Sequence, residues 1–67
     1  MYGTPKLLSE VSKRTNIEVR TLQRWAIRGE GPKMFKLGHR WMAYDVDVDR
    51  WLQEQYERAG GGRDAAA

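Results

Sequence analysis

The chain has 67 residues, no cysteine, one histidine and a net charge of +3. That composition excludes a disulfide framework and a thiolate metal site, and His39 cannot form a zinc site alone. No apolar run approaches the ~20 residues that span a bilayer, and residues 1–6 lack the pattern of a signal peptide. We therefore expect one small cytoplasmic domain with no metal, no cofactor and no membrane partner.

Charge is distributed unevenly along the chain. Residues 1–44 hold nine basic and three acidic side chains, whereas residues 45–67 hold three basic and six acidic ones. The first two-thirds of the chain thus favours a polyanionic partner, and the last third is expected to face away from it.

The first predicted helix follows a short irregular start. A glycine and a proline interrupt residues 1–7, which are expected to form a flexible arm. Ser9 is predicted to be the N-cap of the helix. The helix is expected to break at Thr15 and Asn16, because asparagine tolerates the left-handed conformation that a sharp turn between helices needs.

The second predicted helix runs from about Glu18 to Arg28. Glu18 would lie in its first turn, where a negative charge favours the helix dipole. Gly29, followed shortly by Pro32, is a strong signal that the helix stops.

The outward face of this second helix is basic. Arg20, Arg24 and Arg28 are four residues apart, so they form one ridge, and Thr21 and Gln23 also point outward. Arginine reads guanine and glutamine reads adenine in the major groove of DNA. The alternative interpretation is an amphipathic helix whose arginines are only solvated. That interpretation would be preferred if the arginine ridge were the only feature of its kind in the sequence.

A β-hairpin is predicted next. Residues 33–37 and 40–44 flank the two-residue connection Gly38-His39, in which glycine leads. Lys36, His39 and Arg40 would make the tip of the hairpin basic.

Alternation along the two strands predicts which side chains face inward. We expect Trp41 and Ala43 to cover the same face as Phe35 and Leu37, and Met42 to point outward, with burial of Met42 as the alternative.

The last predicted helix begins at Asp45 as its N-cap. Asp47 and Asp49 would complement the helix dipole, which explains these acidic residues better than a metal site does. Glycines end the helix, so residues 8–58 are expected to form the domain and residues 59–67 a disordered tail. The residues spaced to face a core are Leu8, Val11, Ile17, Leu22, Trp25, Phe35, Leu37, Trp41, Ala43, Val48, Trp51 and Leu52.

The order helix, turn, helix, hairpin, helix predicts a mainly α fold with a small β-hairpin, which is a winged helix-turn-helix. The chain resembles the winged-helix DNA-binding domains of phage excisionases, also called recombination directionality factors, and of MerR-type regulators. The resemblance is carried by residues 8–11, 16–25, 29–32, 36–41 and 47–52. Family members often have Gly where Asn16 stands, and Ser or Thr where Glu18 stands.

The resemblance implies an architectural DNA-binding protein. MerR-type regulators continue into a long dimerisation helix, so the early end of this chain favours an excisionase. Such factors place the second helix in the major groove and the wing in the minor groove. Copies assemble on adjacent repeats and bend the DNA, so that phage integrase acts in the excisive direction. The implied partners are double-stranded DNA, integrase and further copies on the nucleoid of a bacterial host.

The expected DNA-binding residues are Arg20, Thr21, Gln23, Arg24, Arg28, Lys36, His39 and Arg40. For Lys13 and Arg14, phosphate contact and simple exposure to solvent are equally expected. A small repressor and a protein-interaction module remain alternative functions. An enzyme is not expected, because no catalytic set can be drawn from the sequence.

Overall fold

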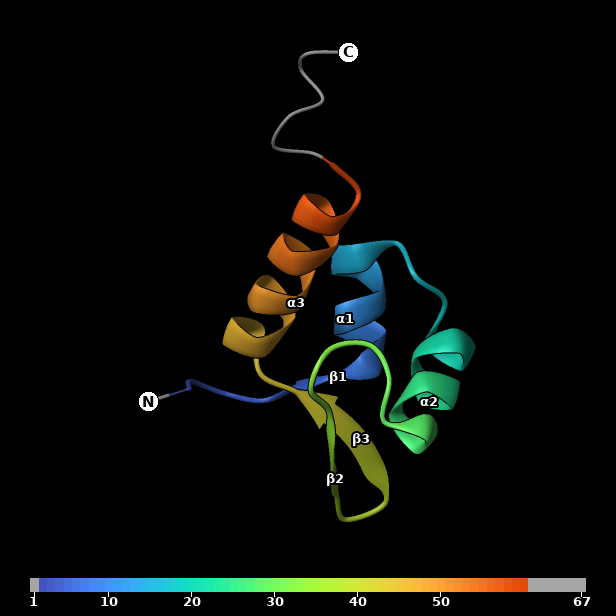
Figure 1. Ribbon diagram of the computed structural model, residues 1–67. Helices are drawn as coiled ribbons and strands as arrows, with labels where there is room; N and C mark the ends of the chain where they lie inside the picture. The colour runs from blue at the N-terminus through green and yellow to red at the C-terminus, as the bar shows by residue number, and fades with distance from the viewer. Residues whose placement is uncertain (1, 61–67) are drawn as a thin grey trace.

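A computed structural model describes residues 2–60, and these form three helices and a three-stranded antiparallel sheet (Figure 1). The elements in chain order are β1 (Lys6–Leu7), α1 (Leu8–Thr15), α2 (Val19–Arg28), β2 (Phe35–Leu37), β3 (Arg40–Ala43) and α3 (Asp45–Arg58). The predicted fold class, a mainly helical winged helix-turn-helix, is confirmed. None of the helices in the described part is long and apolar enough to cross a membrane.

The beginning of the chain differs from the predicted arm. Lys6 pairs with Ala43 and Leu7 with Met42, so residues 6 and 7 form an edge strand beside β3. The pairing gives the backbone of β3 hydrogen-bonding partners on both sides, which an isolated hairpin would lack. The tail predicted for residues 59–67 lies outside the described residues, apart from the turn at 59–60.

The predicted starts of the helices are wrong by one or two residues. Leu7 is the N-cap of α1, because β1 runs directly into the helix, and Ser9 already lies in the first turn. Tyr44 is the N-cap of α3, so Asp45 also lies in a first turn. Glu18, expected inside α2, is instead its N-cap residue. At the three helix N-caps within residues 2–60, no side chain makes a capping hydrogen bond.

The turn between α1 and α2 has the predicted left-handed residue. Asn16 has a φ of 63°, and its N–H donates to the carbonyl oxygen of Ser12 at 2.8 Å. The hydroxyl of Thr15 donates to the carbonyl oxygen of Val11 at 2.8 Å and accepts the N–H of Ile17 at 3.3 Å. The bond from Asn16 satisfies a carbonyl that the end of a helix otherwise leaves open, and Thr15 gives the N–H of Ile17 a partner in the turn.

The end of α2 is a Schellman motif. Gly29 adopts a φ of 76°, its N–H donates to the carbonyl of Ala26 at 3.2 Å, and the N–H of Glu30 donates to that of Trp25 at 2.7 Å. Gly31 follows, with a φ of 77°. A Cβ atom at Gly31 would stand 2.7 Å from Cε3 of the Trp25 ring, so the loop backbone packs directly on that ring.

The hairpin register corrects the predicted faces of the strands. The opposed pairs are Phe35 with Met42, Lys36 with Trp41 and Leu37 with Arg40. Because opposed residues share a face, Trp41 and Ala43 lie on the other side of the sheet from Phe35 and Leu37. The two-residue turn, with Gly38 at a φ of 65°, enforces this phase by pairing the residues next to it.

The core lies where α1, α2 and α3 meet the sheet. Its buried side chains among the described residues are Leu8, Val11, Leu22, Ala43 and Val48. Trp51 is only partly buried and lies against Trp25, with ring centroids 5.8 Å apart. Leu37, predicted to face the core, is 55% exposed, and Phe35 stacks on Tyr44 instead.

Candidate nucleic-acid interface

Helix α2 has one apolar and one polar face. Leu22 is fully buried, and Trp25 packs against the core from the next turn. Since a helix repeats every 3.6 residues, this anchoring directs the remaining positions outward. The exposed polar side chains of α2 are Arg20, Gln23, Arg24 and Arg28. Thr21 is half-buried at the edge of this face.

Few carboxylates within the molecule lie close to the arginines of α2. Within residues 2–60, no carboxylate lies within 4.0 Å of Arg20 or Arg24. Arg28 has Glu30 at 4.0 Å, at the limit of an ion pair. Two guanidinium groups on the middle of the helix are therefore available to an external anion.

The hairpin carries further basic groups to its tip. Figure 1 shows β2 and β3 extending away from the helices, with their turn at the far end. Lys36, His39 and Arg40 are all exposed. The Nζ of Lys36 lies 5.9 Å from the centroid of the Trp41 ring, on the same face of the sheet.

A groove separates α2 from the hairpin. Its volume is about 290 Å³, and it is lined by Leu7, Leu8, Ser9, Val19, Gln23, His39, Arg40 and Trp41. Three of the predicted site residues therefore meet there: Gln23 from the helix, and His39 and Arg40 from the hairpin. The other five predicted residues do not line this groove: Arg20, Thr21, Arg24, Arg28 and Lys36.

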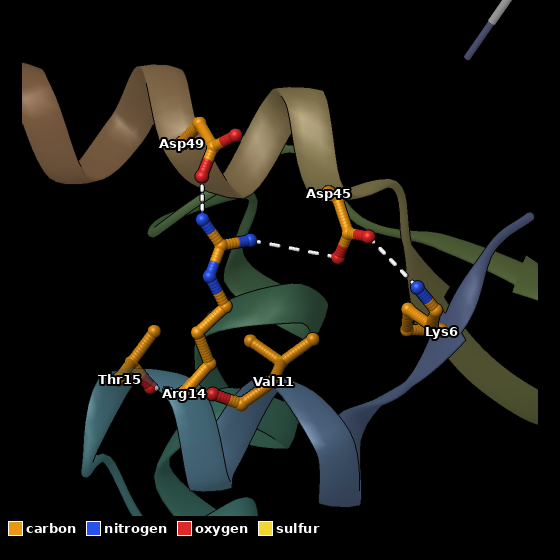
Figure 2. Close-up of polar contacts among 6 residues, drawn as sticks. All are labelled: Lys6, Val11, Arg14, Thr15, Asp45 and Asp49. Carbon is orange, nitrogen blue, oxygen red and sulfur yellow. Dashed lines mark hydrogen bonds and ion pairs between the residues drawn. The ribbon is translucent and has the colours of Figure 1, made fainter. Parts of the chain in front are cut away.

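Other basic side chains are paired within the molecule, as Figure 2 shows. The Nζ of Lys6 donates to Oδ2 of Asp45 at 2.7 Å. Arg14 reaches from α1 to two carboxylates of α3, Asp45 at 3.5 Å and Asp49. The hydrogen bond from Lys6, followed by the nearby charges of Lys6 and Arg14, lowers the pKa of Asp45. We call these four residues the ionic clasp; it assigns Arg14 a partner that sequence reasoning could not identify.

The helical pattern puts Ile27 at the margin of the inward face of α2, and the predicted site does not include it. In the structure Ile27 is 75% exposed. The signal was present, because Ile27 follows Arg20 by seven residues and therefore lies two turns away on the same face.

The fold and the exposed basic helix define a DNA-binding helix-turn-helix protein. Residues 8–56 match the family model described as a helix-turn-helix domain, which covers well over half of the chain. The chain belongs to the helix-turn-helix domain family. No curated protein and no solved structure matches it.

Proposed function

We propose that the protein binds duplex DNA with α2 in the major groove and the β2–β3 wing in the neighbouring minor groove, and that it acts as an excisionase. One observation carries the DNA-binding mode. Gln23 of α2 and the wing residues His39 and Arg40 line one groove. On the same helix, Arg20 and Arg24 have no carboxylate within 4.0 Å among residues 2–60. A polar, basic helix beside a basic wing suits two adjacent DNA grooves.

Helix α2 would supply the base contacts. Arg20 and Arg24 are suited to bidentate hydrogen bonds with guanine or to phosphate contact, and Gln23 to adenine. Thr21 would contact a phosphate or a thymine methyl from the edge of the face. Arg28 is assigned to phosphate because it lies in the last turn of the helix. Its carboxylate neighbour Glu30, 4.0 Å away, is at the limit of an ion pair.

The wing would contact the DNA backbone and the minor groove. Arg40 is the principal residue in this role, because a narrow minor groove attracts arginine through its negative potential. Lys36 and His39 would add contacts at the tip. Each phosphate that a cation neutralises adds about 0.9 to the logarithmic salt slope of binding.

The excision role rests on the resemblance of the helix, wing and closing-helix segments to phage excisionases. In that role, copies bind adjacent direct repeats and bend the DNA, and phage integrase then works in the excisive direction. The protein would act in the cytoplasm, on the nucleoid of the bacterial host, with integrase and neighbouring copies as partners.

A gel-shift titration against a fragment library of the source genome tests the proposal. At about 150 mM salt, non-specific binding is weak, at ~10⁻⁴–10⁻⁶ M. We expect a ladder of shifted bands on one fragment near an attachment site. A single shifted species over an inverted repeat would instead indicate a dimeric repressor. If no fragment shifts, the DNA-binding role is wrong, and an acidic protein partner becomes the better hypothesis.

A recombination assay then separates excision from simple occupancy of the site. With the integrase encoded beside that fragment, the wild-type protein should raise excisive recombination and lower integrative recombination. Arg24→Ala should do neither, whereas Arg50→Ala, on α3, should behave as wild type.

A further inference from the structure

Ile27 is an apolar residue on a polar face. It is 75% exposed, more than any other large hydrophobic side chain among the described residues. Its helix buries Leu22 and packs Trp25 against the core, so the fold uses the opposite side of α2. The side chain is thus left in water in the free protein, without a packing role.

The position of Ile27 follows a spacing that recognition helices use. Arg20, Gln23, Arg24 and Ile27 stand at i, i+3, i+4 and i+7, and therefore share one face. Recognition helices that lie along the major groove, as in homeodomains, present four side chains to base edges at this same spacing. Ile27 completes a set whose other three members can form hydrogen bonds.

The chemistry of isoleucine selects one feature of the major groove. Among the four bases, only thymine presents a methyl group there, and apolar side chains recognise it by contact. Isoleucine is β-branched, so its rotamer is largely fixed on a helix and its methyl groups are held in place.

We propose that Ile27 reads the C5-methyl group of a thymine. The inference rests on the proposed docking of α2 in the major groove, and it names a specificity determinant within that site. Seven residues of helix span about 10.5 Å, and base pairs are stacked about 3.4 Å apart. The thymine should therefore lie about three base pairs from the base that Arg20 reads.

The test removes single methyl groups from the DNA. Wild-type protein first selects its site from a pool of random-sequence duplexes. Each thymine of the selected site is then replaced singly by deoxyuridine, which removes only the methyl group. The Kd of each duplex is measured for the wild type, for Ile27→Ala and for Tyr56→Ala, which removes a 61% exposed side chain from α3.

We expect one deoxyuridine to weaken wild-type binding about fourfold, the effect of losing one buried methyl group. Ile27→Ala should be weaker on the thymine site and indifferent to that same replacement, while Tyr56→Ala keeps the full response. The inference is overturned if every replacement affects the wild type and Ile27→Ala equally. It is also overturned if Ile27→Ala loses only cooperativity, which would place Ile27 between copies. If no sequence is enriched, sequence-specific binding itself fails, and the inference fails with it.

Discussion

Arg14 and Arg24 lie on consecutive helices, yet they have opposite surroundings. Arg14 is held by Asp45 and Asp49 in the ionic clasp, whereas no carboxylate in the described part of the chain lies within 4.0 Å of Arg24. The residue type and the charge are the same. The neighbours therefore decide whether a guanidinium joins two helices or remains available to a ligand.

The comparison also revises what the charge pattern means. The acidic last third of the chain was expected simply to face away from a polyanion. Two of its carboxylates instead join α3 to α1 and β1 by pairing with Lys6 and Arg14. These two cations are counted among the nine of residues 1–44, so the charge available to DNA is concentrated on α2 and the wing.

The largest predicted effect comes from removing the core that both regions share. Leu22→Ala should lower the free energy of unfolding by about 2–5 kcal/mol, because Leu22 is fully buried. Ile27→Ala, on the same helix, should change it by less than about 0.5 kcal/mol. Urea denaturation of both variants tests this, and equal losses would contradict the burial pattern. Trp51→Ala should cost less than the ~3–5 kcal/mol of a fully buried tryptophan, since Trp51 is partly exposed.

The next prediction compares alanine variants of the two arginines directly. Arg24→Ala should weaken binding to the selected duplex by about 1–3 kcal/mol and leave the melting temperature unchanged. Arg14→Ala should leave binding unchanged and cost about 0.2–1 kcal/mol of stability, as exposed ion pairs do. Isothermal titration and thermal melting of both variants give the comparison. A loss of DNA affinity in Arg14→Ala alone would reverse our assignment of the two regions.

A smaller effect should appear in the salt dependence of binding. Arg40→Ala should reduce the slope of log K against log salt by about 0.9, which corresponds to one phosphate contact. Arg50→Ala removes the same charge from α3 and should leave the slope unchanged. Fluorescence anisotropy between about 50 and 200 mM salt measures both slopes, and identical slopes for the two variants would exclude the wing from the interface.

The smallest effect concerns acid stability of the ionic clasp. The pKa of Asp45 is lowered in the folded protein by the hydrogen bond from Lys6. The ionised carboxylate therefore stabilises the fold above its ordinary pKa of 3.8, and this contribution is lost as the pH falls through the lower folded value. Asp45→Asn should flatten that part of the curve of melting temperature against pH. Asp47→Asn is the control and should retain the wild-type shape.

Local signals in the sequence were enough to predict the helices and their turns. Asn16 and Gly29 each adopt the left-handed conformation that their chemistry allows, and both helices end there. The i, i+3, i+4 pattern placed Leu22 in the core and the arginines of α2 outside it. These features depend on residues within one or two helical turns of each other.

Features that depend on distant pairing were missed. Lys6 and Leu7 form a strand only because Ala43 and Met42 lie beside them. Ser9 is not the N-cap that the sequence predicted, because that strand runs directly into α1. The partners of Arg14 are more than thirty residues away in sequence, and spacing does not connect them. The error in the strand faces has a different origin. A two-residue turn fixes the phase of the two strands, so the correct faces could have been predicted from the sequence.

The close packing of Gly31 on Trp25 holds the loop that leads from α2 to the hairpin against the helix in the free protein. The loop has a fixed backbone turn and an indole ring against it, with no side chain between them. Association therefore requires little loss of conformational freedom in this loop, and the binding free energy is not reduced by ordering it. In this respect the two elements that we propose to contact DNA are a preorganised pair.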